Sequence, residues 1–190
     1  AIDLKAINEA NDTVPLFDVT EVKDIPAGTD VSFVMQISKT EDFAKYAEIP
    51  VVNVDSKCYA LASSIQKEYL SLIGRSPKAK DVYVRYASYM VKNGASSVRI
   101  GGPDYFIGQT VVNVTPYPSD LVIEDNYYLL GTINGWSVAT AIKFDHSGDP
   151  YDNPVFTLKV DISEADAAAG WWWKIVPEST YITGDWVKAP

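Results

Sequence analysis

The first half of the chain alternates between apolar and polar residues in short runs, the pattern typical of β-strands. The alternation is clearest over residues 31–38 and 81–91, where apolar side chains recur at every second position. Asn93-Gly94 directly after the second run predicts a hairpin turn. Shorter strand-like runs complete a set of about seven, at residues 14–17, 19–22, 50–54, 98–100 and 109–117. Pro15 indicates an edge position for the first of them.

One segment of this half has helical spacing instead. Its apolar residues are separated by four, four and three positions: Leu61, Ile65, Tyr69 and Leu72. The pattern predicts an amphipathic helix that ends at Gly74, with Asp55 or Ser56 as a candidate cap. The even spacing of strands and turns over residues 1–118 predicts an immunoglobulin-like or fibronectin type III-like β-sandwich with this helix inserted.

A proline-rich stretch at residues 115–120 is the best candidate linker, because two prolines precede polar residues. We therefore expect two domains, 1–118 and 119–190, in an all-β protein of two β-sandwiches. The second domain has four strand-like runs, at residues 126–131, 139–144, 155–162 and 170–177. Residues 163–170 predict a short Ala-rich turn, and residues 145–154 and 178–184 predict loops.

Three consecutive tryptophans open the last of these runs, Gly170–Pro177. Strand alternation places Trp171 and Trp173 on one face and Trp172 with Lys174 on the other. Because lysine is rarely buried without a partner, we expect the Lys174 face to be the wet one. Trp171 and Trp173 are then assigned to the core, and Trp172 to a partly exposed position.

Composition excludes several classes of partner and site. The chain is ordinary for a globular protein, with 47% hydrophobic residues, and its net charge of −9 argues against nucleic-acid binding. It has no apolar run long enough to cross a bilayer, and we expect no signal peptide because Ala1–Leu4 lacks the basic and apolar regions of one. A single cysteine and a single histidine make a zinc site improbable, and no cofactor is predicted.

Two groups of residues are candidates for chemistry. Asp145, Asp149 and Asp152 offer carboxylates for glycoside hydrolysis or calcium binding, but a solvated Asp/Gly/Pro turn has the same composition and is favoured. Cys58 and His146 offer a nucleophile and a base, yet the apolar neighbours of Cys58 favour a small buried thiol. We therefore predict that the protein is not an enzyme.

All five tryptophans of the chain lie in the C-terminal 65 residues. A small β-domain needs one or two for its core, so the surplus requires another explanation. Indole faces stack well on pyranose rings, with Lys, Asn or Asp nearby to bond the hydroxyls. An interface with another protein would bury the same rings, and composition alone does not separate the two.

The C-terminal domain resembles the starch- and glycogen-binding β-sandwich modules. The resemblance rests on a strand ending in glycine, an Asn-Gly-Trp turn, a Phe-containing strand and a Trp-Lys-Ile strand, at residues 127–131, 134–136, 156–158 and 173–175, where the family pattern of the last strand is aromatic-Lys-aromatic. In that family the turn Trp, the strand Lys and a later Trp form the α-glucan site. The resemblance thus implies Trp136, Lys174 and Trp186 as ligand-binding residues, and strand alternation adds Trp172.

The N-terminal domain resembles that of the SusE/SusF-type starch-binding outer-membrane lipoproteins, on residues 32–43, 82–87 and 112–117. Membership implies a non-catalytic, cell-surface protein of polysaccharide utilisation that binds an oligo- or polysaccharide. It also implies attachment to the outer membrane through a lipid anchor in the full-length precursor, and we expect the anchoring cysteine to be absent here if the leader was removed. The alternative is a protein-interaction module that docks another outer-membrane uptake protein. Family members usually carry further modules, so the chain is expected to be a fragment or a divergent form.

Overall fold

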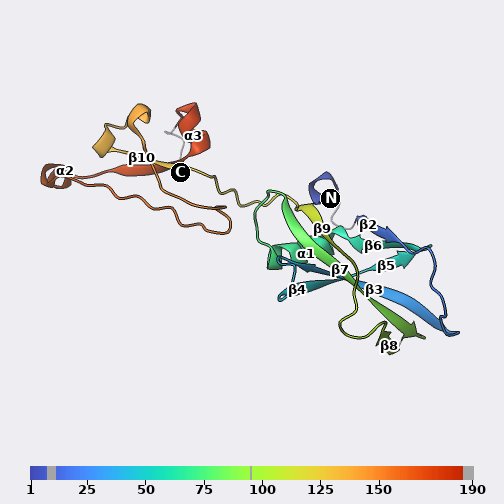
Figure 1. Cartoon of the computed structure of the whole chain (residues 1–190). Coiled ribbons are helices and arrows are strands. Elements are labelled where there is room, and N and C mark those ends of the chain that lie inside the picture. The colour runs from blue at the N-terminus through green and yellow to red at the C-terminus, as the bar shows by residue number, and fades with distance from the viewer. Residues whose placement is uncertain (8–11, 95, 186–190) are drawn as a thin grey trace. The chain divides into compact units, whose positions relative to one another are not determined.

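The computed structural model describes residues 1–7, 12–94 and 96–185, and its regular structure is mostly β (Figure 1). The chain divides into two compact units, Ala1–Ser119 and Asp120–Pro190. We call them the N-terminal unit and the C-terminal unit and describe each by itself.

The larger sheet of the N-terminal unit has six strands. Two long strands with strict alternation, β3 and β7, pair antiparallel along ten residues from Thr29–Lys92 to Ser38–Tyr83 and form its centre. β9 joins β7 on the other side and pairs in parallel with β1. The order is β1 (Ile2–Asp3), β9 (Ile107–Thr115), β7 (Lys80–Lys92), β3 (Thr29–Ser38) and β4 (Tyr46–Pro50), with β8 (Ser96–Arg99) pairing the end of β7.

The second sheet of this unit contains β2 (Thr13–Asp18), β6 (Lys57–Leu61) and β5 (Val52–Val54), in that order. Pro15 lies on the edge strand β2, as predicted. The predicted strand at residues 19–22 is wrong, because those residues form no ladder. β6 was not predicted, and Asp55 and Ser56 do not cap the helix. Both have positive φ, 48° and 65°, and form the turn of the β5–β6 hairpin.

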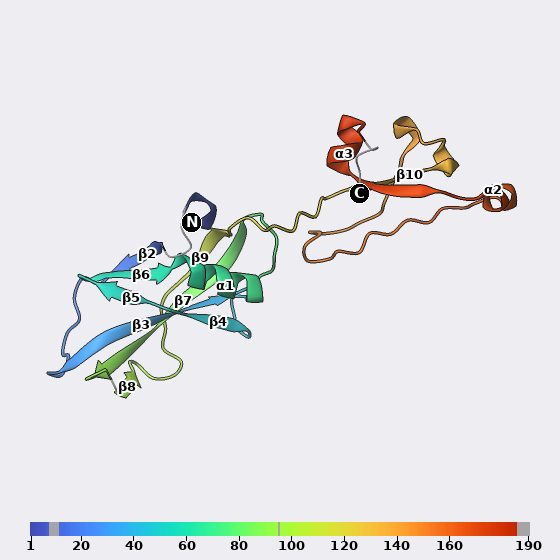
Figure 2. The same cartoon turned by 180° about the vertical axis from the view of Figure 1, so that it is seen from behind.

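The predicted helix is confirmed as α1 (Ala62–Leu72), which contacts β3, β4 and β6 (Figure 2). Its buried side chains, Ile65 and Tyr69, are two of the positions that the spacing selected. They join one hydrophobic core with residues of both sheets. Its buried members are Leu4, in the 3-10 helix η1 (Leu4–Ala6), Val14, Met35, Ile37, Ile49, Ala60, Ala62, Ile65, Tyr69, Ile73, Val82, Val84 and Val114.

The C-terminal unit has one three-stranded antiparallel sheet, with β10 between β11 and β12. Short helices occupy the connections between strands and follow the last strand. In chain order the elements are β10 (Tyr127–Gly131), η2 (Thr132–Asn134), η3 (Val138–Thr140), β11 (Ile142–Lys143), α2 (Glu164–Ala169), β12 (Trp173–Pro177) and α3 (Glu178–Thr183).

Four predictions for this unit are wrong in part. The predicted Ala-rich turn at residues 163–170 contains the helix α2, which Ser163 caps through its side chain. The run at 139–144 yields only the two-residue β11, preceded by a 3-10 turn. Residues 155–162 are extended but make a single ladder contact, the Asp145–Thr157 bridge. The predicted loop at 178–184 contains α3, which follows Pro177, has Glu178 in its first turn and ends at Gly184 with a φ of 68°. These are ordinary helix boundary signals in a polar segment too short for apolar periodicity to be visible.

Candidate functional site

The pairing of β12 with β10 gives the sheet of the C-terminal unit two distinct faces. Cross-strand neighbours share a face, and Lys174 lies opposite Leu130 while Val176 lies opposite Tyr128. We call the surface of these four residues the Lys174 face. Leu130 and Val176 are fully buried, and Tyr128, Trp136, Ala141 and Tyr181 pack against them.

The other side of the sheet, the Trp173 face, carries Leu129, Trp173 and Ile175. Trp173 is 49% exposed and Ile175 41% exposed. The prediction that placed Trp173 in the core and Lys174 on the wet face is therefore wrong. The physical reason is that lysine can lay its aliphatic stem over apolar neighbours while its ammonium group stays near the surface. Lys174 is accordingly only partly buried.

Trp136 reaches the Lys174 face from the loop between β10 and β11, and Asn134 fixes this loop. The Asn134 side chain accepts a hydrogen bond from the Gly131 N–H (2.9 Å) and donates to the Leu129 and Thr140 carbonyls (3.0 and 3.2 Å). Trp136 has a φ of 59° and donates its backbone N–H to Gly131. A left-handed conformation is rare for a bulky residue, so the loop constrains where this indole lies.

The structure therefore brings two of the four predicted ligand-binding residues, Trp136 and Lys174, to the same face of one sheet. Two further rings extend this surface, since Tyr128 on β10 stacks on Tyr181 of α3 with centroids 4.0 Å apart. Glu178 accepts hydrogen bonds from Asn126 (2.8 Å) and from Tyr128 (3.4 Å). Loss of hydration raises the pKa of Tyr128, and Glu178 raises it further, so the phenol keeps its proton and remains a donor.

Trp172 is 72% exposed, the highest value of any tryptophan in the described ranges. β12 begins one residue later, so the alternation that paired Trp172 with Lys174 does not extend to it. Its backbone is held by Thr132, whose N–H donates to the Trp172 carbonyl (3.0 Å). The fourth predicted residue, Trp186, lies outside the described residues.

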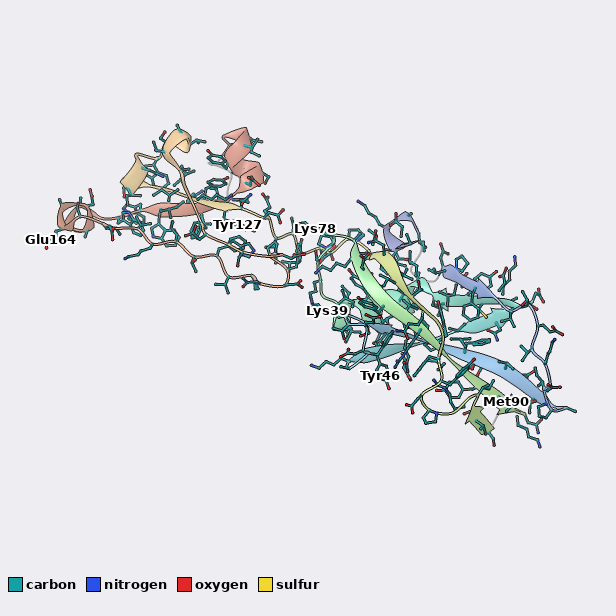
Figure 3. All side chains as sticks on the ribbon, in the orientation of Figure 1. Lys39, Tyr46, Lys78, Met90, Tyr127 and Glu164 are labelled. Atoms are coloured by element: carbon teal, nitrogen blue, oxygen red, sulfur yellow. The ribbon has the colours of Figure 1, made fainter. Side chains whose placement is uncertain are left out.

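Sequence reasoning missed an open apolar groove of about 360 Å³ on the Trp173 face. Its walls combine the sheet with the extended segment 158–162: Leu129, Phe144, Leu158, Val160, Ile162, Trp171, Trp173 and Ile175. Trp171 lies 6.0 Å from Trp173 between ring centroids, and its indole Nε1 is buried without a partner in the described part of the chain. Tyr127, labelled in Figure 3, packs edge-on against Phe156 with ring centroids 4.8 Å apart. The sequence signal that could have revealed this groove was the apolar alternation of residues 156–162.

The candidates for chemistry are held in structural roles. Asp149 accepts hydrogen bonds from the backbone of Tyr151 and Asp152 and so shapes a turn, and no group of three or more potential metal ligands occurs among the described residues. Cys58 is buried and donates its S–H to Asn53 (3.1 Å), and burial raises the pKa of its thiol. His146 lies in the other unit, where its ring stacks on Phe156.

Comparison with known families supports the resemblance over the C-terminal unit. Residues 122–190 match the family model described as "SusF, first starch specific CBM", where CBM denotes a carbohydrate-binding module. The crystal structure of SusF from Bacteroides thetaiotaomicron is 16% identical, with a TM-score of 0.44 over 94% of this chain. The chain covers 36% of the length of that SusF chain. A comparison with curated proteins found no match.

Among the described helices, none combines the length and the apolar character required to cross a bilayer.

Proposed function

We propose that this protein is a non-catalytic binding protein for starch-like α-glucans, and that its sugar site lies on the Lys174 face of the C-terminal unit. The observation that carries the proposal is the convergence of Trp136 and Lys174 on that face, in a segment that matches a starch-specific module. A glucose ring stacks on the Trp136 indole, and Lys174 donates to its hydroxyl groups.

The geometry suits a stacking site. The Asn134 hydrogen bonds and the packing of Trp136 on the buried cluster restrict the ring before ligand arrives, which lowers the entropic cost of binding. Tyr128 and Tyr181 offer additional aromatic surface beside it. Trp172 contributes a second, exposed indole, and Trp186 remains a member of the site by family resemblance. We expect weak affinity per site, because a shallow platform leaves many hydroxyls in water.

The domain roles follow from the same resemblance. In this proposal residues 1–118 form an immunoglobulin-like or fibronectin III-like spacer, and residues 119–190 form the carbohydrate-binding module. The protein acts at the cell surface, held at the outer membrane by a lipid anchor of the precursor. It would retain polysaccharide there for an uptake system.

Titration calorimetry with maltoheptaose, alongside cellohexaose and other oligosaccharides, tests the proposal. We expect binding to maltoheptaose and its loss in Trp136→Phe and Lys174→Ala. Lys159→Ala is the matched control, because Lys159 is an exposed lysine on the segment that lines the opposite groove and should leave affinity unchanged. Absence of binding to every oligosaccharide, or full binding by both site variants, would refute the proposal.

The groove on the Trp173 face favours a second function, contact with another outer-membrane uptake protein. Its lining is apolar except for the indole N–H groups of Trp171 and Trp173, so it offers fewer hydrogen-bonding groups than the Lys174 face. Trp173→Ala tests whether the Trp173 face binds protein while the Lys174 face binds sugar. The variant should form less complex with purified uptake-complex partners, measured by co-sedimentation, and should still bind maltoheptaose. Loss of glycan binding in Trp173→Ala but not in the Trp136 variant would place the sugar in the groove instead.

A further inference from the structure

An arginine of the N-terminal unit is bracketed by two aromatic rings. The guanidinium carbon of Arg85, on β7, lies 3.5 Å from the ring centroid of Phe106 and 4.0 Å from that of Phe43. Two rings at these distances cannot occupy the same side of one guanidinium group, so they cover its opposite faces. Phe43 is itself buried, with a φ of 51°, and its loop is thereby fixed against the sheet.

Only the edge of this guanidinium group is left for further interactions. Its Nε donates to Gln36 (2.8 Å), and the Gln36 amide in turn donates to Glu48 (2.9 Å). Within the described ranges, its two terminal nitrogens donate to no protein atom. Arg85 is partly exposed. A planar edge with parallel N–H donors fits the two oxygens of a carboxylate.

A second cation lies on the same ring. Arg99 approaches Phe106 at 4.5 Å and Tyr89 at 5.3 Å, and donates to the Tyr89 hydroxyl and the Tyr105 carbonyl. In the part of the chain that the structure describes, neither arginine forms an ion pair with a carboxylate. Burial lowers the pKa of Arg85, and the charge of Arg99 adds to that effect while Tyr46 opposes it. An anion bound here would offset both the lost hydration of the Arg85 charge and its repulsion by Arg99.

An exposed aromatic ring adjoins the site. Tyr46 is labelled in Figure 3 and lies on the edge strand β4, which β3 separates from β7. It is 49% exposed, and its ring centroid lies 5.9 Å from the Arg85 guanidinium carbon. The protein therefore combines an exposed ring face with a rigid donor edge on one surface of the larger sheet. A sugar ring can stack on the first while a carboxylate on that sugar bonds the second.

We propose that Arg85 and Tyr46 form a binding site for acidic sugars, in which Arg85 holds the carboxylate of a uronic acid residue and Tyr46 stacks on its ring. The site is independent of the α-glucan site, because it uses the other unit and a different chemistry. Its ligands are glycans that contain glucuronic or galacturonic acid.

Heteronuclear NMR titration of the whole protein with trigalacturonate, at physiological salt, tests this site. We expect shifts at the β4 and β7 amides and none of these shifts with the neutral maltotriose. Arg85→Gln should weaken binding by roughly tenfold or more, and Arg85→Lys nearly as much, because lysine keeps the charge but lacks the two-point edge. Tyr46→Ala should weaken it by roughly two- to tenfold.

Arg75→Gln is the matched control, since it removes one exposed positive charge from the same unit and should leave binding intact. Because Arg85 also contacts two rings, each variant is checked for an unchanged spectrum away from the site, and Tyr46→Ala reports on the site without altering that stack. Lack of trigalacturonate binding, or binding that survives both Arg85→Lys and Tyr46→Ala, overturns the proposal. An Arg85-dependent response to a glutamate-rich peptide without one to trigalacturonate would also overturn it, in favour of a protein ligand.

Discussion

The two units of this protein are held together in different ways. The N-terminal unit has a core in which two sheets and a helix contribute fully buried side chains. The described residues of the C-terminal unit, 120–185, form one sheet, and among them the main cluster has two buried members, Leu130 and Val176. Burial of apolar surface is the main favourable term in folding, so the first unit should carry the larger share of stability.

In the C-terminal unit, hydrogen bonds from side chains to loops supplement the small apolar core in stabilising the fold. Asn134 fixes the loop after β10, and Glu124 and Glu178 tie the start of α3 to the residues before β10. Such a unit leaves large apolar side chains at its surface, where Trp172, Trp173 and Ile175 lie. We infer that a large apolar core stabilises the N-terminal unit, and that a small core supplemented by side-chain hydrogen bonds stabilises the C-terminal unit.

The largest test of this difference is Ile65→Ala, which opens a cavity between α1 and both sheets. We expect the N-terminal unit to lose about 2–5 kcal/mol of unfolding free energy. Because all five tryptophans belong to the C-terminal unit, tryptophan fluorescence follows that unit, while circular dichroism follows both. The unfolding midpoint measured by circular dichroism should therefore fall, and the midpoint measured by tryptophan fluorescence should not change. Leu70→Ala, on the exposed side of the same helix, should change little. An equal shift in fluorescence would show that the units unfold together.

A matching test for the C-terminal unit is Gly131→Ala. Gly131 has an extended backbone that any residue can adopt, but an added Cβ would lie 2.4 Å from the Trp172 carbonyl oxygen. We expect a loss of about 1–3 kcal/mol from overpacking. The fluorescence transition should shift and the N-terminal unit should not, with Gly131→Val more severe. An unchanged fluorescence midpoint would mean that the close approach of β10 and β12 is not required.

Sequence patterns predicted the N-terminal unit more accurately than the C-terminal one, and the packing explains why. Strict alternation over residues 31–38 and 81–91 became β3 and β7, because both strands have one face on a large core. β6 was missed because it runs directly into α1, so that its last residue, Leu61, was assigned to the helical spacing. The order of the strands in the sheets depends on contacts between distant residues, which local periodicity does not encode.

In the C-terminal unit the same alternation was misleading. Residues 155–162 alternate like a strand, yet their apolar side chains cover a groove without a backbone partner. Lys174 was taken to mark the wet face, but its stem lies beside Leu130 on the covered one. The role of Trp136 and Lys174 as a pair came from family resemblance, and their function in sugar binding stays a prediction.

A smaller effect on the stability of the N-terminal unit depends on pH. Burial raises the pKa of Tyr86 to about 12, with a lesser contribution from Cys58, whereas an unfolded tyrosine titrates near pH ~10. The folded state therefore favours the neutral phenol, so its contribution to stability is complete below pH ~10 and is lost as pH rises towards about 12.

We expect the unfolding midpoint of the N-terminal unit to fall over that interval, and Tyr86→Phe to flatten the decline while keeping the ring contact with Phe17. Urea melts at pH 9, 10 and 11 measure the slope. Tyr105→Phe, which removes an exposed phenol, serves as the control. If Tyr86→Phe left the pH dependence of the unfolding midpoint unchanged, the decline would come from other titrating groups.

Trp172→Ala is expected to change stability least, and it tests whether an exposed ring of the C-terminal unit serves ligand binding rather than folding. An exposed ring contributes little to a folded unit, so the unfolding free energy should change by no more than about 0.5 kcal/mol. If the ring serves the ligand, affinity for maltoheptaose should nevertheless fall by roughly two- to tenfold, the range typical of one aromatic contact. Thermal melts followed by fluorescence of the remaining indoles, and calorimetry on the same samples, give both quantities. Lys159→Ala, at an exposed position of the same unit, controls for a surface truncation. A variant that lost stability but kept affinity would make Trp172 part of the fold and reverse the contrast between the two units.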